Sequence, residues 1–478
     1  MRPLPLSPGR SPSRWRVLAL LIALAGLLLS GPSCPRGGSP RTSVLLLTID
    51  SLRTDHVHAL GGSRETSPVL DGLAREGIVW TGVVAPAPWT MPSMMSLMTG
   101  LHPEIHHVDE DDRMLGDGIL TLAQRFQKAG YATAAFVPEI TLSASYGFAR
   151  GFDHFDERRF GHDTVTSPAQ TSSLIHWLEE TPGPFFAWTH LWDPHYNYAP
   201  PPPYDAMFVA GTPPAEGRYY DMIDLKRRKN AMTPEQVASA MGQYDGEIAC
   251  TDHYIGEILD ALRASGRLDA TLIVIAGDHG EAFQEHGWLT HTNTVYEETV
   301  RVPVIARLPG HLPAGRRIGG ARSLVDLTES LAQWAGLRPE TTQSRPLPLE
   351  EGGGEALVVS TTRRQAALLS ARQGRWSLVL EYETCASELY DLDADPSQSR
   401  DVAGAHPDVV RGLKDSLRTW LDEARRQHPV PVTHLDLTGT DALERLKGLG
   451  YVQQDRAGHD NFGDLQGKRV TADPRHCL

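Results

Sequence analysis

The chain has 478 residues, which is enough for one large α/β domain and a smaller appended domain. Its net charge of −14 argues against a nucleic-acid-binding protein, because such a protein needs a basic face that displaces counterions from phosphates. An acidic chain that acts on an anionic substrate must concentrate positive charge locally, for instance on a metal ion.

The N-terminal segment has the pattern of a targeting sequence. Arg10, Arg14 and Arg16 precede the apolar run Val17–Leu29, which is typical of a secretory signal and short for a membrane span. We expect residues 1–34 to be a signal peptide or a membrane or lipid anchor, and residues 35–42 to be a linker. Cys34 is a candidate for lipid attachment, although Gly31 stands where bacterial lipoprotein signals usually have Leu. The protein is therefore expected in the periplasm or cell envelope, with this segment as its only contact with a membrane.

The predicted elements alternate between strands and helices. In chain order they are a strand at Ser43–Ile49, a helix at Ser67–Glu76, a helix at Ile119–Ala129, strands at Tyr131–Val137 and Phe185–Leu191, a helix from Thr233 to Arg263, and a strand at Thr271–Ala276. The strands are continuous apolar runs, as expected for a sheet that is buried on both faces. The pattern predicts a doubly wound, mostly parallel α/β sheet with ligand sites beyond the carboxyl ends of its strands.

The character of the sequence changes after Leu308. Gly- and Pro-rich loops lead to short strand-like runs at Ala356–Ser360 and Trp376–Glu381. We predict a catalytic domain over residues 43–345, an α+β subdomain over 346–435 and a polar tail over 436–478 to which no structure is assigned. The four cysteines have no CxxC spacing, so no thiolate metal site is expected. Export would permit a disulfide, but the sequence does not show which cysteines are within bridging distance. The favoured interpretation is that Cys250 is buried on a helix and that the other cysteines are incidental.

Two acidic segments follow predicted strands and can converge on one cation. Asp50 ends the strand Ser43–Ile49, and Asp278-His279 follows the strand Thr271–Ala276. Carboxylates and an imidazole suit one divalent ion, either calcium, zinc or manganese. Thr90 follows Trp89 at a predicted helix start, where free N–H groups favour an anion. A metal would lower the pKa of the Thr90 hydroxyl, so Thr90 is predicted to be a metal ligand and the nucleophile.

These segments, in this order, resemble the sulfatase family of the alkaline-phosphatase-like superfamily over roughly residues 43 to 400. The family's nucleophile motif, Cys/Ser-x-Pro-Ser-Arg followed by Leu-x-Thr-Gly, is matched by Thr90-Met91-Pro92-Ser93-Met94 and Leu97-Met98-Thr99-Gly100. Asp50 matches the first of the family's paired metal-binding aspartates, and Asp278-His279-Gly280 matches its later metal-binding segment. Further matching segments are Gly130–Ala134, Gly151–Asp156, His190–His195, Tyr244-Asp245, Tyr296–Glu298, Arg301–Pro303 and Glu388–Leu392.

The departures from the family pattern alter the expected chemistry. Thr90 cannot become the formylglycine that classical sulfatases make from Cys or Ser. Ser51 replaces the second metal aspartate and Met94 replaces the motif's Arg. Pro138-Glu139-Ile140-Thr141 has no counterpart of the family's Lys and His. A Thr nucleophile resembles the phosphodiesterase and phosphoethanolamine-transferase relatives, which attack phosphorus directly.

The resemblance also suggests roles for basic residues. His195 matches a family histidine and is predicted to be a catalytic and substrate-binding residue; the alternative is a loop histidine beside Pro200–Pro203. His291 lies about one residue from the family's substrate-contacting Lys and is a candidate to replace it. Arg53 either steadies the Asp50 loop through a carboxylate or contacts substrate. His286 is interpreted as a loop cap rather than a ligand of a second metal.

The remaining polar cluster, His106 and His107 with Asp109–Asp112, is interpreted as a solvated loop.

The leading hypothesis is a metal-dependent hydrolase of an anionic sulfate or phosphate ester, carried by a glycan, lipid or small molecule. One alternative is a phosphoethanolamine-like transferase, which usually has several N-terminal membrane spans. The other is a non-catalytic relative that binds an anionic glycan, which would have no need of Asp50, Thr90, Asp278 and His279 together.

Overall fold

The central sheet is built on three buried strands. In the computed structural model, β1 (Ser43–Ile49) lies between β6 (Phe185–Leu191) and β7 (Thr271–Gly277). The structure describes residues 41–158, 165–209, 225, 228–340, 342–352, 356–364, 366–436, 453–454, 460–461 and 472–478. All three pair in parallel, and nearly every residue in them is buried, as their apolar sequences predict.

The full sheet extends in both directions from this centre. Its order is β11-β2-β10-β7-β1-β6-β4-β5, with β12 also paired to β2. The outer strands are β2 (Ile78–Val84), β4 (Ala132–Phe136), β5 (His154–Asp156), β10 (Arg301–Arg307), β11 (Arg316–Ile318) and β12 (Arg322–Ser323). Only β10 runs antiparallel to its neighbours in this sheet. The predicted doubly wound, mostly parallel α/β fold is confirmed.

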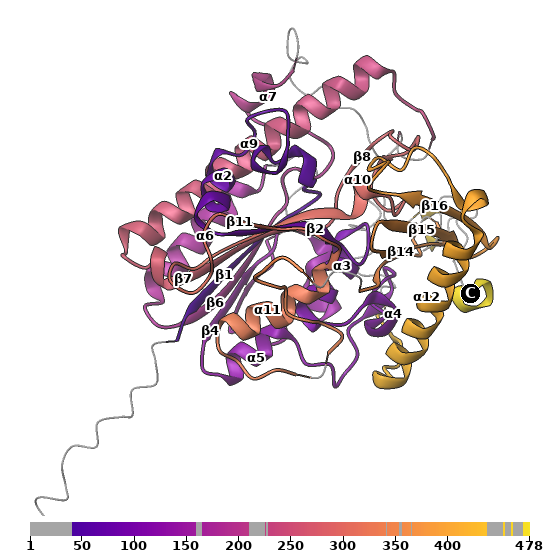
Figure 1. Ribbon diagram of the computed structural model, residues 1–478. Coiled ribbons are helices and arrows are strands. Elements are labelled where there is room, and N and C mark those ends of the chain that lie inside the picture. The colour runs from indigo at the N-terminus through magenta and orange to yellow at the C-terminus, as the bar shows by residue number, and fades with distance from the viewer. Residues whose placement is uncertain are drawn as a thin grey trace, which may run out of the picture. The chain divides into compact units, whose positions relative to one another are not determined.

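Helices cover both faces of the sheet (Figure 1). One face packs against α2 (Pro68–Glu76), α6 (Ser167–Glu180) and α9 (Pro234–Ala264), and the other against α3 (Thr90–Thr99), α5 (Leu122–Lys128) and α11 (Leu327–Trp334). Helix α9 begins with the predicted Thr233 capping box. Helix α5 begins three residues later than predicted, because Thr121 caps it through a second box with Gln124.

A second, antiparallel sheet forms the C-terminal subdomain. Its strands are β13 (Val358–Thr362), β14 (Leu368–Gln373), β15 (Trp376–Glu381) and β16 (Ala386–Asp391), in that order. Helix α12 (Pro407–Gln427) packs on this sheet through Leu413, Leu417 and Leu421. Figure 1 shows this unit beside the α3 side of the central sheet.

The remaining elements are short. They are α4 (Pro103–His106), α7 (Tyr204–Met207), α10 (Glu297–Val300), β3 (Arg113–Met114), β8 (Ala282–Phe283), β9 (Leu289–Thr290), β17 (Thr433–His434), β18 (Gln453–Gln454), β19 (Asp460–Asn461) and the 3-10 helices η1 (Thr54–His56), η2 (His58–Leu60), η3 (Ile140–Leu142), η4 (Ala144–Tyr146), η5 (Leu268–Ala270), η6 (Leu324–Asp326), η7 (Ala403–Ala405) and η8 (Pro474–Cys477).

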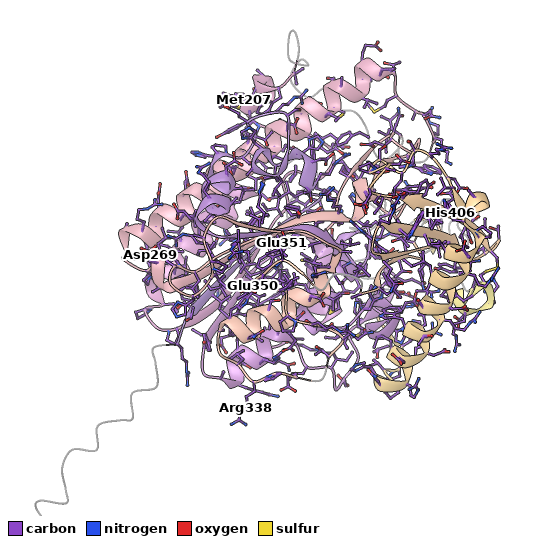
Figure 2. All side chains as sticks on the ribbon, in the orientation of Figure 1. Met207, Asp269, Arg338, Glu350, Glu351 and His406 are labelled. Atoms are coloured by element: carbon purple, nitrogen blue, oxygen red, sulfur yellow. A yellow bond between two sulfur atoms is a disulfide. The ribbon has the colours of Figure 1, made fainter. Side chains whose placement is uncertain are left out.

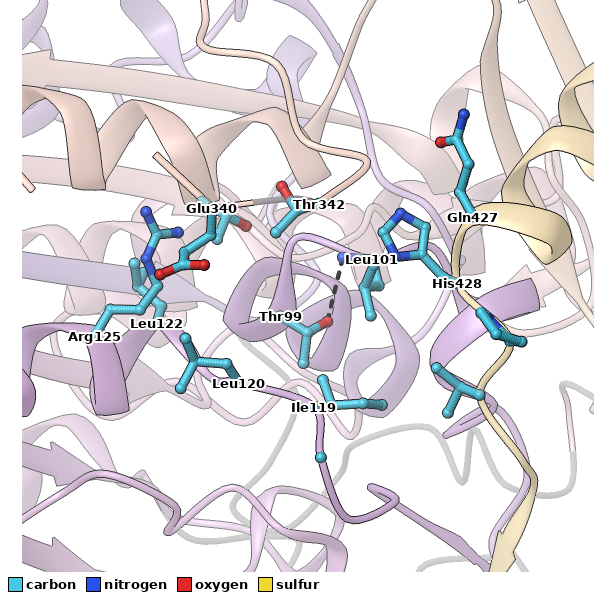
Figure 3. A pocket seen from close by; sticks show the side chains of 14 residues that line it. Thr99, Leu101, Ile119, Leu120, Leu122, Arg125, Glu340, Thr342, Gln427 and His428 are labelled. Carbon is cyan, nitrogen blue, oxygen red and sulfur yellow. Dashed lines mark hydrogen bonds between the residues drawn. The ribbon is translucent and has the colours of Figure 1, made fainter. Parts of the chain in front are cut away.

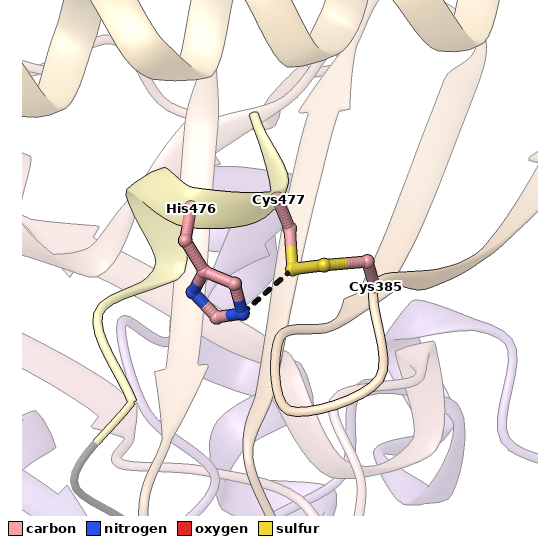
Figure 4. A group of neighbouring side chains, drawn as sticks. All are labelled: Cys385, His476 and Cys477. Carbon is pink, nitrogen blue, oxygen red and sulfur yellow. Dashed lines mark hydrogen bonds between the residues drawn. A yellow bond between two sulfur atoms is a disulfide. The ribbon is translucent and has the colours of Figure 1, made fainter.

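A disulfide joins Cys385, in the turn between β15 and β16, to Cys477 in η8 (Figure 4). This finding corrects the interpretation of these two cysteines as incidental, because residues 92 apart in sequence lie within bridging distance. Within the tail to which the sequence assigned no structure, Pro474–Cys477 forms the 3-10 helix η8. The ion pair between Arg425 and Asp473 holds the same segment. Cys250 is buried on α9, as predicted, and its thiol is free.

The surface carries the charged side chains. Figure 2 labels charged side chains at the surface such as Arg338 and Asp269. Met207 is 53% exposed, and large apolar side chains with this much exposure are rare among the described residues. None of the described helices is long and apolar enough to cross a membrane. The predicted signal or anchor over residues 1–34 lies outside the described residues.

Candidate active site

The register of β1 and β7 brings two aspartates together. Ile49 pairs with Gly277, so Asp50 and Asp278 leave neighbouring strands at the same edge. The carboxylate of Asp278 accepts hydrogen bonds from the backbone N–H groups of Ser51 and His279, at 2.9 and 2.7 Å. The next residue, Gly280, has to be a glycine, because a Cβ at this position would lie 2.1 Å from the carbonyl oxygen of Glu298. The local backbone therefore fixes the carboxylate of Asp278.

Thr90 is the first residue of α3 and is 2% exposed. Its Oγ1 donates to Asp50 Oδ2 at 3.2 Å and lies 3.3 Å from His279 Nε2. Ser93, one turn further along α3, donates its hydroxyl to the carbonyl oxygen of Asp278 at 2.6 Å. The helix start and the two strand ends thus meet at one point, as the sequence predicted for Asp50, Thr90, Asp278 and His279.

The acidic groups at this point form a cation-binding arrangement. Ligand atoms of Asp50, Asp278 and His279 all lie within 4.8 Å of one another, and the three side chains are fully buried. Oδ2 of Asp278 accepts no hydrogen bond from the described residues. Burial and the charge of Asp50 raise the pKa of Asp278, while burial lowers the pKa of His279. Two buried carboxylates beside a neutral imidazole fit a divalent cation well.

His190 at the end of β6 extends this group. Its Nε2 lies 3.2 Å from Asp50 Oδ2, and its Nδ1 lies 2.9 Å from Thr48 Oγ1. Thr48 in turn accepts a hydrogen bond from Trp188 Nε1 at 2.9 Å. The single proton of the Thr48 hydroxyl has two acceptors within reach, the carbonyl oxygen of Thr189 at 3.4 Å and His190 Nδ1 at 2.9 Å. When it is donated to the nearer Nδ1, the imidazole proton is on Nε2 and faces Asp50. No function was assigned to His190 from the sequence. Its position at the end of β6, the strand next to β1, could have indicated that it lies near Asp50.

Two further histidines lie beside His279. The rings of His279 and His291 are 4.4 Å apart, and those of His291 and His195 are 5.0 Å apart. His291 Nδ1 contacts Glu281 Oε1 at 3.1 Å, and His195 Nδ1 contacts the carbonyl oxygen of Tyr196. Burial raises the pKa of Asp50, but the charge of His195 and contacts with His190 and His279 outweigh it and lower that pKa. The structure therefore brings both predicted histidines to the site.

Arg53 follows the Asp50 loop and donates to the carboxylates of Asp55 and Glu285. Its Nε and Nη2 donate to the two oxygens of Asp55 at 2.9 and 2.8 Å, and Nη1 donates to Glu285 and to the carbonyl oxygen of Glu281. These contacts match the structural alternative for Arg53, in which it steadies the Asp50 loop. His286 likewise contacts Glu298 and the carbonyl oxygen of Gln398, as a loop cap would.

The acidic segment after α4 corrects one expectation. Its residues were interpreted as a solvated loop, but Asp109, Glu110 and Asp111 are at most 7% exposed and His106 is 1% exposed. The segment is buried because arginines from elsewhere in the chain neutralise it. Asp109 pairs with Arg363 at 3.4 Å, and Asp111 accepts two hydrogen bonds from Arg364 at 2.5 and 2.7 Å. Sequence reasoning missed these long-range pairs.

Met94, which replaces the motif's arginine, and Glu139, in the segment that lacks the family's Lys and His, have different surroundings. Met94 is fully buried in the apolar core on the α3 side of the sheet. Glu139 caps η3 by accepting the N–H of Thr141 at 3.0 Å, and its Oε1 has no hydrogen-bond partner among the described residues. Burial and the charges of Asp50 and Asp278 raise the pKa of Glu139, although the Thr141 bond and Arg364 oppose that rise. An acid stands near the site where the family has basic residues.

A separate cavity of about 370 Å³ lies at the other end of α3 (Figure 3). Its lining includes Thr99, Arg125, Glu340 and His428. Thr90 and Thr99 are the two ends of this helix, which puts roughly 14 Å between them at 1.5 Å per residue. The cavity is therefore not part of the site around Thr90.

The profile of the sulfatase family matches residues 42–337. The chain belongs to the sulfatase family. It is accordingly a hydrolase that acts on ester bonds, and Asp50, Thr90, Asp278 and His279 all lie within the matched residues.

Known sulfatases and solved structures are similar over most of this chain. A sulfatase of Formosa agariphila is 22% identical over 421 residues, which cover 75% of this chain and 82% of that protein. A structure solved with its substrate D-glucosamine-2-N,6-O-disulfate superposes with a TM-score of 0.69 at 20% identity, covering 81% of this chain and 98% of the other. The phosphonate monoester hydrolase of Agrobacterium radiobacter gives 0.68 at 21% identity, covering 87% and 99%. These likenesses establish the fold.

Proposed function

We propose that this sulfatase-family protein is a metal-dependent hydrolase of sulfate or phosphate esters in which the Thr90 hydroxyl is the nucleophile. The observation that carries the proposal is the placement of Oγ1 between Asp50 Oδ2 at 3.2 Å and His279 Nε2 at 3.3 Å. The start of α3 adds N–H groups and a dipole that favour negative charge at this position.

Asp50, Asp278, His279 and Thr90 would hold one divalent cation, either calcium, zinc or manganese. When bound, it would supply positive charge that lowers the pKa of the Thr90 hydroxyl and offsets the charge of the substrate's anionic group. His190 and Ser51 both contact the carboxylate of Asp50 and would keep it in position.

The reaction divides into two displacements. The Thr90 hydroxyl gives its proton to solvent, its Oγ bonds to the sulfur or phosphorus atom, and the bond from that atom to the leaving oxygen breaks. His195 or His291 donates the proton that this oxygen needs, and their ring contacts beside His279 support either role. Water then attacks the same sulfur or phosphorus atom, which releases the acid and returns the hydroxyl to Thr90.

The substrate is proposed to be an anionic ester of a glycan, a lipid or a small molecule. A Thr cannot be converted to formylglycine, so direct attack favours phosphorus over sulfur as the target. The structural likeness to a phosphonate monoester hydrolase supports a phosphorus ester, and the likeness to a protein solved with a disulfated glucosamine supports a sulfated glycan. Substrate assays must separate the two.

The protein is further proposed to be exported to the periplasm or cell envelope. The disulfide between Cys385 and Cys477 supports this location, because structural disulfides persist mainly in oxidising compartments. Fractionation of expressing cells should find the protein outside the cytoplasm. Cys385 and Cys477 of this protein should not react with thiol reagents. A reduced protein confined to the cytoplasm would refute the proposal.

Turnover of aryl sulfate, phosphate monoester and phosphate diester should be measured with calcium, zinc and manganese. We expect Thr90→Ala to lower kcat by at least about 1,000-fold when the protein is saturated with metal, because Asp50, Asp278 and His279 remain to hold the cation after the Thr90 ligand is lost. Thr99→Ala, at the other end of the same buried helix, is the matched control and should retain most activity. Intact mass measured after rapid quenching should show one phosphoryl or sulfuryl group on wild type and none on Thr90→Ala.

Full metal-dependent turnover in Thr90→Ala would show that the nucleophile assignment is wrong. Transfer of the group to added alcohols in preference to water would favour the transferase alternative. Absence of turnover with every metal, together with tight binding of an anionic glycan, would favour the non-catalytic alternative.

A further inference from the structure

Four acidic side chains gather at the site around Thr90. Asp50, Asp278 and Glu281 are fully buried, and Glu139 is 6% exposed. Burial raises the pKa of Asp278 and of Glu139, so that their charged forms are disfavoured. Met94 stands where the family's motif has an arginine, and it lies in the apolar core. The segment Pro138–Thr141 has no basic residue. An anionic substrate therefore needs a protein cation from another part of the chain.

Arg364 reaches this edge of the sheet from the C-terminal subdomain. It lies in the loop between β13 and β14, is 5% exposed, and holds its guanidinium carbon 4.2 Å from the ring centre of Trp89. Trp89 immediately precedes Thr90, so the stacked guanidinium is next to the start of α3. The Arg364 charge also acts on Glu139, after β4, and on Tyr196, after β6.

The surroundings of Arg364 fix its position. Asp111 accepts two hydrogen bonds from Nη2, and the Trp89 ring covers one face of the guanidinium. The neighbouring Arg363 anchors the same loop by donating to Glu104 and to the carbonyl oxygen of Ala472. A buried arginine held in this way loses little side-chain freedom when it binds a ligand.

We propose that Arg364 is a substrate-binding residue that contacts the tetrahedral oxyanion of the substrate beside Thr90. A planar guanidinium matches two oxygens of a sulfate or phosphate group, which makes arginine suited to this task. The inference rests on the proposed function, because it places the reacting group at Thr90. It assigns anion recognition to the C-terminal subdomain and nucleophilic attack to the α/β domain.

Binding of inorganic phosphate and inorganic sulfate tests the inference without turnover. Titration calorimetry on metal-loaded Thr90→Ala protein gives a Kd for each ion, and the same titration is repeated with Arg364→Gln or Arg364→Lys added. We expect Arg364→Gln to raise both Kd values about 10-fold to 100-fold and Arg364→Lys to raise them less, with metal content unchanged. Arg372→Gln is the control. Arg372 lies on β14 and pairs with Glu297 of α10, so its substitution should leave Kd unchanged.

A Kd for Arg364→Gln within twofold of the parent protein, at equal metal content, would overturn the inference. If Arg364→Gln does not fold, Arg364→Lys decides the question, since it keeps the charge but loses the forked geometry; an unchanged Kd would again overturn the role. Anion binding that depends on Arg364 in a protein without turnover would leave this inference standing while the proposed function fails. If turnover persists but substitution of Arg364 does not change anion binding, the proposed function stands and this inference fails.

Discussion

The carboxylate of Asp50 is contacted from three sides by protein groups. Ser51 donates to Oδ1 at 2.8 Å, while Thr90 and His190 both meet Oδ2 at 3.2 Å. Such contacts set the orientation of a metal-binding carboxylate, and outer groups of this kind typically change metal affinity by 10-fold to 100-fold when removed. His190 is accordingly a positioning residue for Asp50.

We predict that His190→Ala raises the Kd for the activating metal by about 10-fold to 100-fold, because Asp50 loses a hydrogen bond that orients it. Metal titration of the apo-protein measures the effect. His176→Ala, on the exposed surface of α6, should leave the Kd unchanged. An unaltered Kd in His190→Ala would mean that Asp50 holds its orientation without this residue.

At the level of single residues, the sequence was informative where a side chain follows a strand or begins a helix. Asp50, Thr90, Asp278 and His279 could be predicted because parallel strands end at a shared edge. Arg364 and Asp111 could not, since their contact joins residues 253 positions apart and no local pattern records it. The acidic run was misinterpreted for the same reason.

At the scale of elements, His102 joins three parts of the chain. It precedes α4, its Nε2 donates to the carbonyl oxygen of Val359 in β13 at 2.9 Å, and its ring meets Trp420 of α12 edge-on at 4.8 Å. Burial lowers its pKa from 6.5 to about 4, against the opposing Val359 bond and the charges of Glu104 and Asp109. The contact between the catalytic domain and the C-terminal subdomain thus contains a neutral histidine.

This pKa predicts a pH-dependent stability. The unfolded chain takes up a proton at His102 near pH 6.5 and the folded chain does so only near pH 4, so stability falls as the pH drops between these values. The loss from this group is about 3 kcal/mol at the acid end. Urea unfolding at pH 7 and pH 4.5 should show a smaller difference for His102→Gln than for wild type. An equal difference in both proteins would exclude His102 as the source.

The elements themselves were mostly predictable. Apolar runs located β1, β6 and β7, and Thr233 with Gln236 located the start of α9, because burial and capping are local properties of a sequence. The start of α5 was misplaced because Thr121, rather than the apolar pattern, determines it. The predicted domain limits at residues 345 and 435 remain predictions.

At the scale of the whole molecule, the disulfide between Cys385 and Cys477 closes the C-terminal subdomain. Cys477 and Leu478 pack against its apolar core, and Arg425 bridges Asp473 and Glu104. The last described residues are therefore tied both to the antiparallel sheet and to α4 of the catalytic domain. No spacing motif in the sequence could have predicted this pairing.

We predict that the double variant Cys385→Ser, Cys477→Ser loses about 2–4 kcal/mol of unfolding free energy, because the bond restricts a long loop in the unfolded chain. Guanidinium unfolding with and without reductant measures the loss. Reductant should destabilise wild type by a similar amount and leave the double variant unaffected. A reductant effect of equal size on both proteins would point to a cause other than this bond.

The stacking of Arg364 on Trp89 joins two parts of the gene that can change separately. Insertions, deletions or substitutions in the loop between β13 and β14 would move a charge beside Thr90 without altering any codon of the nucleophile helix or of β1 and β7. On the proposed substrate-binding role of Arg364, natural selection, or a laboratory library confined to this loop, would vary which esters are accepted while Asp50, Thr90, Asp278 and His279 stay constant.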